Sequence, residues 1–203
     1  MKILELFSGT KSVSKAYPNL DIVSLDIIDK HKPTIVCDIL EWDYKKDYAE
    51  GYFDIVWASP PCIEYSILKN NTGMATNLEL ADKIVLKTLE IIDYFKPKKW
   101  FIENPQTGLL KKREFMKDIP FYDVDYCRFS DWGYRKRTRI WTNTKYENKL
   151  CLKEGKCPNM EGRFHKASFG GQGRPKEYTY IKVKAGENAH RVPTELIKDL
   201  FGI

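Results

Sequence analysis

The sequence of 203 residues lacks the features of membrane and secreted proteins. It has no apolar run of about 18 residues, the length that a membrane-spanning helix needs. Its first residues lack the basic segment, apolar stretch and cleavage site of a signal peptide. Its five cysteines are odd in number and widely spread, unlike a disulfide framework. We therefore expect a soluble, cytoplasmic protein without membrane contact, whose thiols are free, catalytic or metal-bound.

Internal repeats and low-complexity segments are also absent, and the composition excludes intrinsic disorder. Hydrophobic residues make up 42% of the chain and charged residues 31%, whereas disordered chains combine few hydrophobic residues with a high net charge. A chain of this length can bury a sizeable core without disulfide or metal links. We expect a monomer with one full domain and a small appendage.

Charge is abundant but unevenly divided along the chain. The 34 Lys and Arg residues and 28 Asp and Glu residues give a net charge of +6. Residues 1–95 carry a net charge of −5, and residues 96–203 carry +11. This division indicates that the first part handles a small ligand and the second contacts a polyanion. A solvated basic surface without a partner is the alternative.

Short apolar runs alternate with helical segments, a pattern typical of a doubly wound α/β sheet. The helices are expected from after Thr10 to Tyr17, at residues 78–94 and after Pro193, and residues 145–185 show no sustained periodicity. We therefore divide the chain into a core (1–144), a small insert (145–185) and a C-terminal segment that returns to the core (186–203). The strands are expected at residues 3–7, 22–26, 34–38, 54–59, 100–102, 121–129 and 139–142, with Cys37 and Cys127 in core strands.

The ends of the first three expected strands carry groups that suit a nucleoside cofactor. Phe7-Ser8-Gly9-Thr10 forms a turn into a helix, and its glycine lets a ligand approach the backbone. Asp26 can accept hydrogen bonds from ribose hydroxyls, and Asp38 from an adenine amino group. The turn has no G-x-G-x-x-G phosphate cradle, so S-adenosylmethionine, which lacks phosphates, fits better than NAD. Alternatively, Gly9 only forms the turn and the two aspartates cap helices.

Three further sites follow along the chain. Pro60-Pro61 restricts the backbone before Cys62, which can be a nucleophile or, as lone cysteines more often are, a buried structural thiol. Glu103 can hold a proton near neutral pH if water is excluded, and is otherwise a solvated carboxylate. Arg135, Arg137 and Arg139 share one face of an extended segment, which suits phosphate or a base carbonyl, or else a solvated edge strand.

In this order, these residues resemble the cytosine-C5 DNA methyltransferase family. The resemblance covers residues 1–142 and resumes from Gly186, with Asn188 ahead of Val192-Pro193. It implies the Rossmann-like sheet of a class I methyltransferase with S-adenosylmethionine as cofactor. The implied cofactor-binding residues are Phe7, Ser8, Gly9, Thr10, Asp26, Ile27, Asp38, Ile39, Pro61 and Asn188.

The resemblance also implies a mechanism. Cys62 falls on the nucleophile that attacks cytosine C6, and Glu103 on the carboxyl that engages N3. Arg137 and Arg139 fall on arginines that order the site and contact the base. The target cytosine is flipped out of double-stranded DNA, or comes from a single strand, because a stacked base is out of reach. The candidates for DNA contact are Ser66, Arg135, Lys166, Arg174 and Lys176.

The insert raises two further expectations. It is short for a target-recognition region, so we expect short or relaxed sequence specificity. Cys151, Cys157 and His165 offer three ligands for a structural zinc ion, with no fourth ligand evident. Two free thiols and a surface histidine are the alternative.

Two other functions and two biological settings stay open at this point. Ser59-Pro60-Pro61 also resembles the motif of amino-methyltransferases of the N4-cytosine type, although Cys62 occupies their aromatic position. A catalytically silent nucleic-acid-binding module is the other function. The settings are restriction-modification, in which a bacterial cell marks its own DNA, and a virus that evades a nuclease in the host cytosol.

Overall fold

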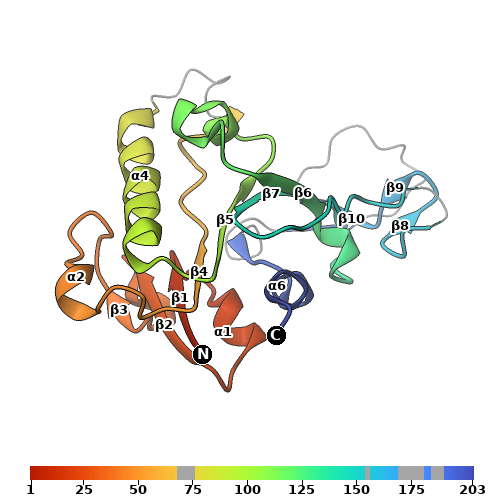
Figure 1. Ribbon diagram of the computed structural model, residues 1–203. Coiled ribbons are helices and arrows are strands. Elements are labelled where there is room, and N and C mark those ends of the chain that lie inside the picture. Colours follow the sequence, from red (N-terminus) through yellow and green to blue (C-terminus); the bar gives the residue numbers. More distant parts are fainter. Residues whose placement is uncertain (68–75, 154–155, 169–180, 184–189) are drawn as a thin grey trace.

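The computed structural model describes residues 1–67, 76–153, 156–168, 181–183 and 190–203. A seven-stranded sheet runs through it in the order β3-β2-β1-β4-β5-β7-β6 (Figure 1). Strands β1 to β5 are parallel, and β7 is antiparallel to both of its neighbours. The strands are β1 (Lys2–Leu6), β2 (Asp21–Asp26), β3 (Ile35–Val36), β4 (Ile55–Ala58), β5 (Lys99–Pro105), β6 (Phe121–Asp125) and β7 (Arg137–Thr142).

The strand order reverses between β1 and β4. From β1 the chain builds β2 and β3 on one side, and then crosses to place β4 and β5 on the other. Leu6 pairs with both Leu25 and Ala58, so β1, β2 and β4 end at the same level. In open α/β sheets a ligand crevice forms at this reversal, beyond the carboxyl ends of the strands.

Helices cover both faces of the sheet (Figure 1). On one face lies α4 (Leu78–Phe95), and on the other lie α1 (Ser12–Ala16) and α6 (Thr194–Phe201). None of the helices within the described ranges is both long and apolar enough to cross a bilayer. The remaining short helices are α2 (Tyr44–Asp47), η1 (Asp29–His31), η2 (Leu109–Lys112), η3 (Glu114–Met116) and η4 (Tyr126–Arg128).

The long helix α4 follows from its sequence. The Asn77 side chain caps its first turn by accepting from the Leu80 N–H at 3.0 Å. Ala81, Val85, Ile92 and other apolar residues recur every three or four positions and are buried against the sheet. The helix ends where Lys96 takes the left-handed conformation before Pro97.

The C-terminal segment packs against the start of the chain. The Val192 N–H donates to Oγ of Ser12, just before α6. The fully buried Phe201 stacks on Phe101 at 5.2 Å and on Tyr17 at 5.7 Å between ring centroids. Helix α6 therefore completes the core on this face of the sheet.

The three expected helices are present as α1, α4 and α6, and the strand positions agree except at their ends. The expected strand at 34–38 shrinks to β3, and the strand at 100–102 extends to β5. The expectation that the strand at 121–129 continues through Cys127 is wrong, because β6 ends at Asp125 and η4 follows. The Ser130 hydroxyl and the Asn159 side-chain amide bind the carbonyls of Tyr126 and Cys127, which turns this backbone away from the sheet. Cys37 follows β3 and is half-buried.

Small strands follow the main sheet. An antiparallel hairpin joins β8 (Met160–Glu161) to β9 (Phe164–His165), and β10 (Ala167–Ser168) pairs in parallel with β11 (Ile181–Lys182). Strands β8 to β10 extend away from the β6–β7 end of the main sheet (Figure 1).

Replacing Phe201 with alanine tests the role of α6 in the core. Loss of this buried ring leaves a cavity against Phe101 and Tyr17, and we expect the free energy of unfolding to fall by about 3–5 kcal/mol. Urea denaturation followed by circular dichroism measures the change. Ile203→Ala is the matched control, because Ile203 is 50% exposed. Equal stability of the two variants would contradict this account.

Candidate active site

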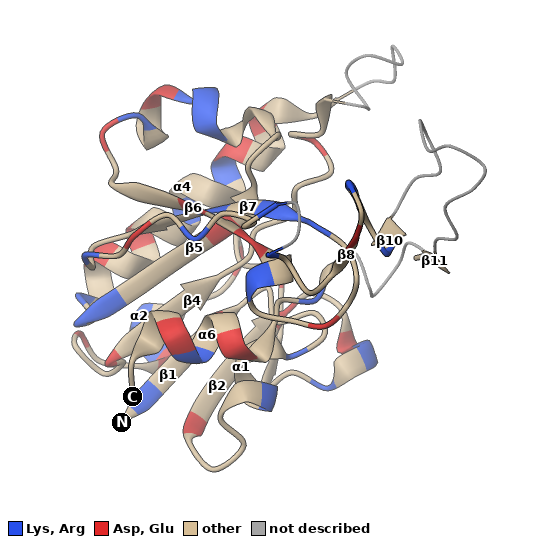
Figure 2. Ribbon diagram, turned by 90° about the vertical axis from the view of Figure 1, so that its right-hand side faces the viewer, with Lys and Arg blue, Asp and Glu red and all other residues tan. Residues whose placement is uncertain are grey.

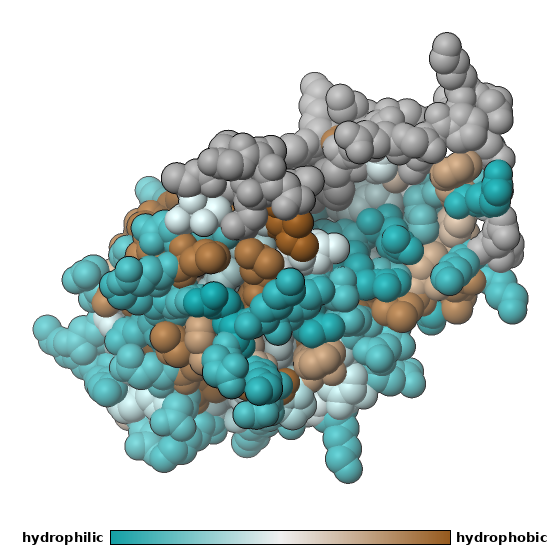
Figure 3. Space-filling view, turned by 90° about the horizontal axis from the view of Figure 1, so that it is seen from above, coloured by the Kyte–Doolittle hydropathy of each residue, from teal (hydrophilic) through white to brown (hydrophobic). Residues whose placement is uncertain are grey.

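A cavity of about 680 Å³ lies at the carboxyl ends of β1, β2, β4 and β5. Figure 3 looks down on this side of the molecule, where apolar surface shows among hydrophilic side chains. The cavity brings Cys62 and Glu103 together with nearly all of the expected cofactor residues. Those that line it are Phe7, Ser8, Gly9, Thr10, Asp26, Ile27, Asp38, Ile39 and Pro61. Asn188 lies outside the described residues, although His190 and Val192 line the cavity.

The turn after β1 is held against the end of β2. Phe7 and Gly9 both have a positive φ, at 56° and 42°, which turns the chain sharply out of the strand. The Gly9 N–H donates to Oδ2 of Asp26 at 2.8 Å, and the Ile28 N–H donates to Oδ1 at 2.9 Å. Each carboxylate oxygen can accept a second hydrogen bond, so Asp26 can still bind a ligand hydroxyl.

Two buried polar atoms at the cavity have no hydrogen-bond partner among the described residues: Oγ of Ser8 and Oδ1 of Asn104. Buried polar atoms are nearly always paired in folded proteins. Two such atoms at one cavity therefore indicate that a polar ligand belongs there.

Below the cavity, Glu5 anchors the first helix. Its carboxylate accepts from the Val13 N–H at 2.9 Å and from the Ser14 hydroxyl at 2.9 Å. Burial raises the pKa of Glu5, and the hydrogen bonds to Val13 and Ser14 oppose that rise. Glu5 also lines the cavity. We did not predict it as a site residue, because the only indication in the sequence was a charged residue inside an apolar strand.

Cys62 stands on a rigid turn at the end of β4. The side-chain amide of Asn104 donates to the carbonyl of Pro60 at 2.9 Å, which fixes this turn to β5. Burial raises the pKa of the Cys62 thiol, and the negative charge of Glu103 raises it further, whereas the positive charge of Lys136 lowers it. Lys136 is therefore the nearby charged side chain that favours the thiolate, and a backbone hydrogen bond at Cys62 acts in the same direction.

The side chain of Glu103 is buried and bound by the neighbouring strand. Its Oε1 accepts hydrogen bonds from the hydroxyl of Tyr126 at 3.0 Å and from that of Thr138, and Lys136 Nζ lies 3.8 Å from the same oxygen. Burial raises the pKa of Tyr126, so this phenol keeps its proton and donates. Tyr126, Thr138 and Lys136 were not predicted as site residues. The alternation along β7 was a signal for Thr138, which falls on the face opposite the arginines.

Arg137 and Arg139 point to the other face of β7. Arg137 forms two hydrogen bonds with Asp125, at 2.9 and 2.7 Å, and Arg139 forms two with Asp123, at 2.8 and 3.0 Å. The guanidinium of Arg139 also lies 3.6 Å from the ring centroid of Phe121. These ion pairs join β7 to β6. The structure therefore does not bring Arg137 and Arg139 to the cavity.

Comparison with known proteins now decides the family. Residues 28–149 match the family model described as C-5 cytosine-specific DNA methylase. The chain is 39% identical over 220 aligned residues to the probable DNA (cytosine-5)-methyltransferase of Frog virus 3 (isolate Goorha), and the alignment covers 100% of both chains. The chain belongs to the C-5 cytosine-specific DNA methylase family.

Membership of the C-5 cytosine-specific DNA methylase family confirms the expected reaction class, an S-adenosylmethionine-dependent DNA (cytosine-5)-methyltransferase, and the strand order fits the expected doubly wound sheet. A solved structure of a putative DNA modification methyltransferase from an E. coli prophage is also similar, with a TM-score of 0.48 and 14% identity. That match covers 70% of this chain and 46% of the other, so the chain spans less than half of that protein.

Of the expected DNA contacts, Ser66, Arg135 and Lys166 are described, and none of these three lines the cavity. Arg135 is exposed, and Lys166 Nζ donates to the carbonyl of Pro158 at 2.8 Å. Ser66 is half-buried one residue after Tyr65, whose hydroxyl binds Asp82. Figure 2 shows basic and acidic residues close together along β6 and β7. Arg174 and Lys176 lie outside the described residues.

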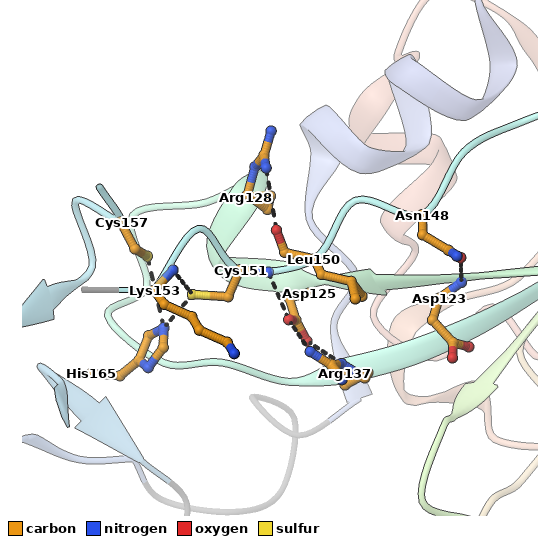
Figure 4. Close-up of polar contacts among 10 residues, drawn as sticks. All are labelled: Asp123, Asp125, Arg128, Arg137, Asn148, Leu150, Cys151, Lys153, Cys157 and His165. Carbon is orange, nitrogen blue, oxygen red and sulfur yellow. Dashed lines mark hydrogen bonds and ion pairs between the residues drawn. The ribbon is translucent and has the colours of Figure 1, made fainter. Parts of the chain in front are cut away.

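The expected metal ligands Cys151, Cys157 and His165 do converge, and a fourth side chain joins them. Nε2 of His165 lies 3.5 Å from Sγ of Cys151 and 3.8 Å from Sγ of Cys157 (Figure 4). Cys127, from η4, belongs to the same cluster. Its part was missed because the sequence placed Cys127 in a core strand.

Lys136→Met tests the electrostatics around Cys62. Removing the positive charge leaves burial and Glu103 opposed only by a backbone hydrogen bond, so the pKa of the Cys62 thiol rises further. Because the thiolate is the reactive form, we expect alkylation of Cys62 by iodoacetamide at pH 8 to slow about threefold to tenfold, with its pH midpoint shifted upward. Peptide mass spectrometry follows Cys62 alone. Lys117→Met, at an exposed lysine, is the control, and an unchanged rate in Lys136→Met would refute the assignment.

Proposed function

We propose that the protein methylates C5 of cytosine in DNA through a covalent bond between Sγ of Cys62 and C6 of the base. The observation that carries this proposal is the single cavity that joins the turn after β1 with Cys62 and Glu103. A methyl donor and a cytosine ring held in one cavity can react without a further binding step.

The residues that would hold S-adenosylmethionine surround the first half of the cavity. Gly9 gives close access to the backbone, Asp26 would accept the ribose hydroxyls and Asp38 the adenine amino group. The unpaired Oγ of Ser8 offers a further hydrogen bond to this ligand. When bound, S-adenosylmethionine supplies an electrophilic methyl group.

Cys62 and Glu103 would act on the base in turn. The Cys62 thiolate adds to C6, and the displaced ring electrons are stabilised as Glu103 donates a proton to N3. C5 then carries the electron density needed to take up the methyl group. Water takes up the C5 proton, departure of the thiolate restores the aromatic ring, and Glu103 regains the proton from N3.

The surroundings of Glu103 suit this proton transfer. Tyr126 and Thr138 both bind Oε1, which leaves Oε2 as the oxygen that carries the proton to N3. Lys136, beside Oε1, offsets the negative charge that forms when the proton has moved. Arg137 and Arg139 act as positioning residues, because their pairs with Asp125 and Asp123 fix the strand that carries Thr138.

The DNA partner approaches from the basic half of the chain. The target cytosine would be flipped out of double-stranded DNA, at a cost of about a few kcal/mol, or taken from a single strand. Ser66, Arg135 and Lys166, with Arg174 and Lys176, would hold the backbone. In this scheme a monomer uses residues 1–144 and 186–203 for catalysis, and residues 145–185 for a short or relaxed target site. The relative from Frog virus 3 supports a virus-encoded setting over restriction-modification.

A duplex that contains 5-fluorocytosine at target sites tests the covalent step. Fluorine cannot leave C5 as the proton does, so the enzyme and DNA stay joined once the methyl group has transferred. With S-adenosylmethionine we expect a complex that survives denaturing electrophoresis for the wild type, and none for Cys62→Ser. Glu103→Gln should form it about 10²–10³ times more slowly, because an amide is a poor proton donor.

Glu114→Gln, at an exposed carboxylate, is the matched control and should behave as the wild type does. Methyl transfer that survives in Cys62→Ser would overturn the proposal in favour of an amino-methyltransferase. Binding of cofactor and DNA without any transfer would overturn it in favour of a silent binding module.

A further inference from the structure

Four metal-binding side chains meet away from the catalytic cavity. Cys127 lies in η4, Cys151 follows β7, Cys157 precedes β8, and His165 ends β9. One ligand atom from each lies within 4.8 Å of all the others. Cys62 and Glu103 take no part in this cluster, so the reaction does not account for it.

The spacing of the ligand atoms fits a tetrahedral ion. Zinc binds sulfur at about 2.3 Å and histidine nitrogen at about 2.1 Å, so neighbouring sulfur and nitrogen ligands are about 3.6 Å apart. Nε2 of His165 lies 3.5 Å from Sγ of Cys151 and 3.8 Å from Sγ of Cys157 (Figure 4). These two distances match the spacing of ligands in a closed four-ligand site, and the remaining ligand atoms lie within 4.8 Å of one another.

The surroundings of the cluster also differ from those of an ordinary hydrophobic core. The three cysteines are buried, and Met160 packs against them. The Lys153 N–H points to Sγ of Cys151 at 3.4 Å, the kind of contact that stabilises a thiolate.

We propose that Cys127, Cys151, Cys157 and His165 bind one structural Zn²⁺ ion. Three soft thiolates and one imidazole in a tetrahedral arrangement select zinc over hard cations such as Mg²⁺ or Ca²⁺. The four ligands leave no open position for water or substrate, which makes the ion structural and not catalytic.

The ion would fix the insert to the catalytic sheet. Cys127 belongs to the segment directly after β6, while the other three ligands come from residues 151–165. The Cys151 N–H donates to Oδ2 of Asp125 at 2.8 Å, and Asp125 also binds Arg137 of β7 (Figure 4). Asn159 adds a second link by donating to the carbonyls of Cys127 and Ser130. Zinc at this point would hold the basic insert in a set position beside the DNA-binding side.

Metal analysis of the purified full-length protein tests the proposal directly. By inductively coupled plasma mass spectrometry we expect one zinc per chain, and after exchange with Co²⁺ the intense visible absorption of a tetrahedral thiolate site. Cys127→Ser and His165→Ala should lose most of the bound metal. His165→Cys should retain it, because four thiolates also bind zinc.

Cys62→Ser is the matched control, since it removes a thiol outside the cluster and should leave one zinc per chain. His165 lies on the small hairpin, so the comparison of His165→Ala with His165→Cys does not depend on whether Cys127→Ser folds. Folded wild type without stoichiometric metal would overturn the proposal, as would a disulfide between two of the three cysteines or full zinc content in both His165→Ala and Cys127→Ser.

Discussion

The site depends on the parallel pairing of β1 with both β2 and β4. Because the chain places β2 and β3 on one side of β1, and β4 and β5 on the other, a cavity opens beyond the carboxyl end of β1. The turn at Gly9, the carboxylate of Asp26 and the Pro60-Pro61 turn therefore open onto the same cavity. The packing of α4 on one face and of α1 and α6 on the other buries the sheet from which these turns emerge. Sheet topology thus places Cys62, the proposed nucleophile, beside the ligand cavity.

Strand β7 contacts the cavity residue Glu103 with one face and strand β6 with the other. Its antiparallel pairing with β5 brings Thr138 to the face of Glu103, while Arg137 and Arg139 bind the acidic residues of β6 on the other face. Asp125 then connects this strand pair to Cys151 of the cluster. The chemistry of the cavity and the position of the insert therefore depend on one edge of the sheet.

The sequence predicted those site residues whose position follows from the ends of short apolar runs. The turn at residues 7–10, Asp26, Asp38, Cys62 and Glu103 directly follow or end short apolar runs, and parallel strands bring such positions to one edge. Contacts between distant segments were harder to predict. The direction in which Arg137 and Arg139 point depends on the register of β7 with β6. The grouping of Cys127 with His165 depends on η4, which bends the chain after β6 where the residue types favour a continuing strand. Tyr126 was not predicted as a site residue for the same reason, because it begins η4.

The position of the transferred methyl group tests the central claim most directly. DNA incubated with the protein and S-adenosylmethionine labelled in its methyl group would be digested to nucleosides and separated by liquid chromatography with mass spectrometry. If Cys62 activates C5 as proposed, the label appears in 5-methyl-2′-deoxycytidine. Label in N4-methyl-2′-deoxycytidine, or unlabelled DNA despite bound cofactor, would contradict the account.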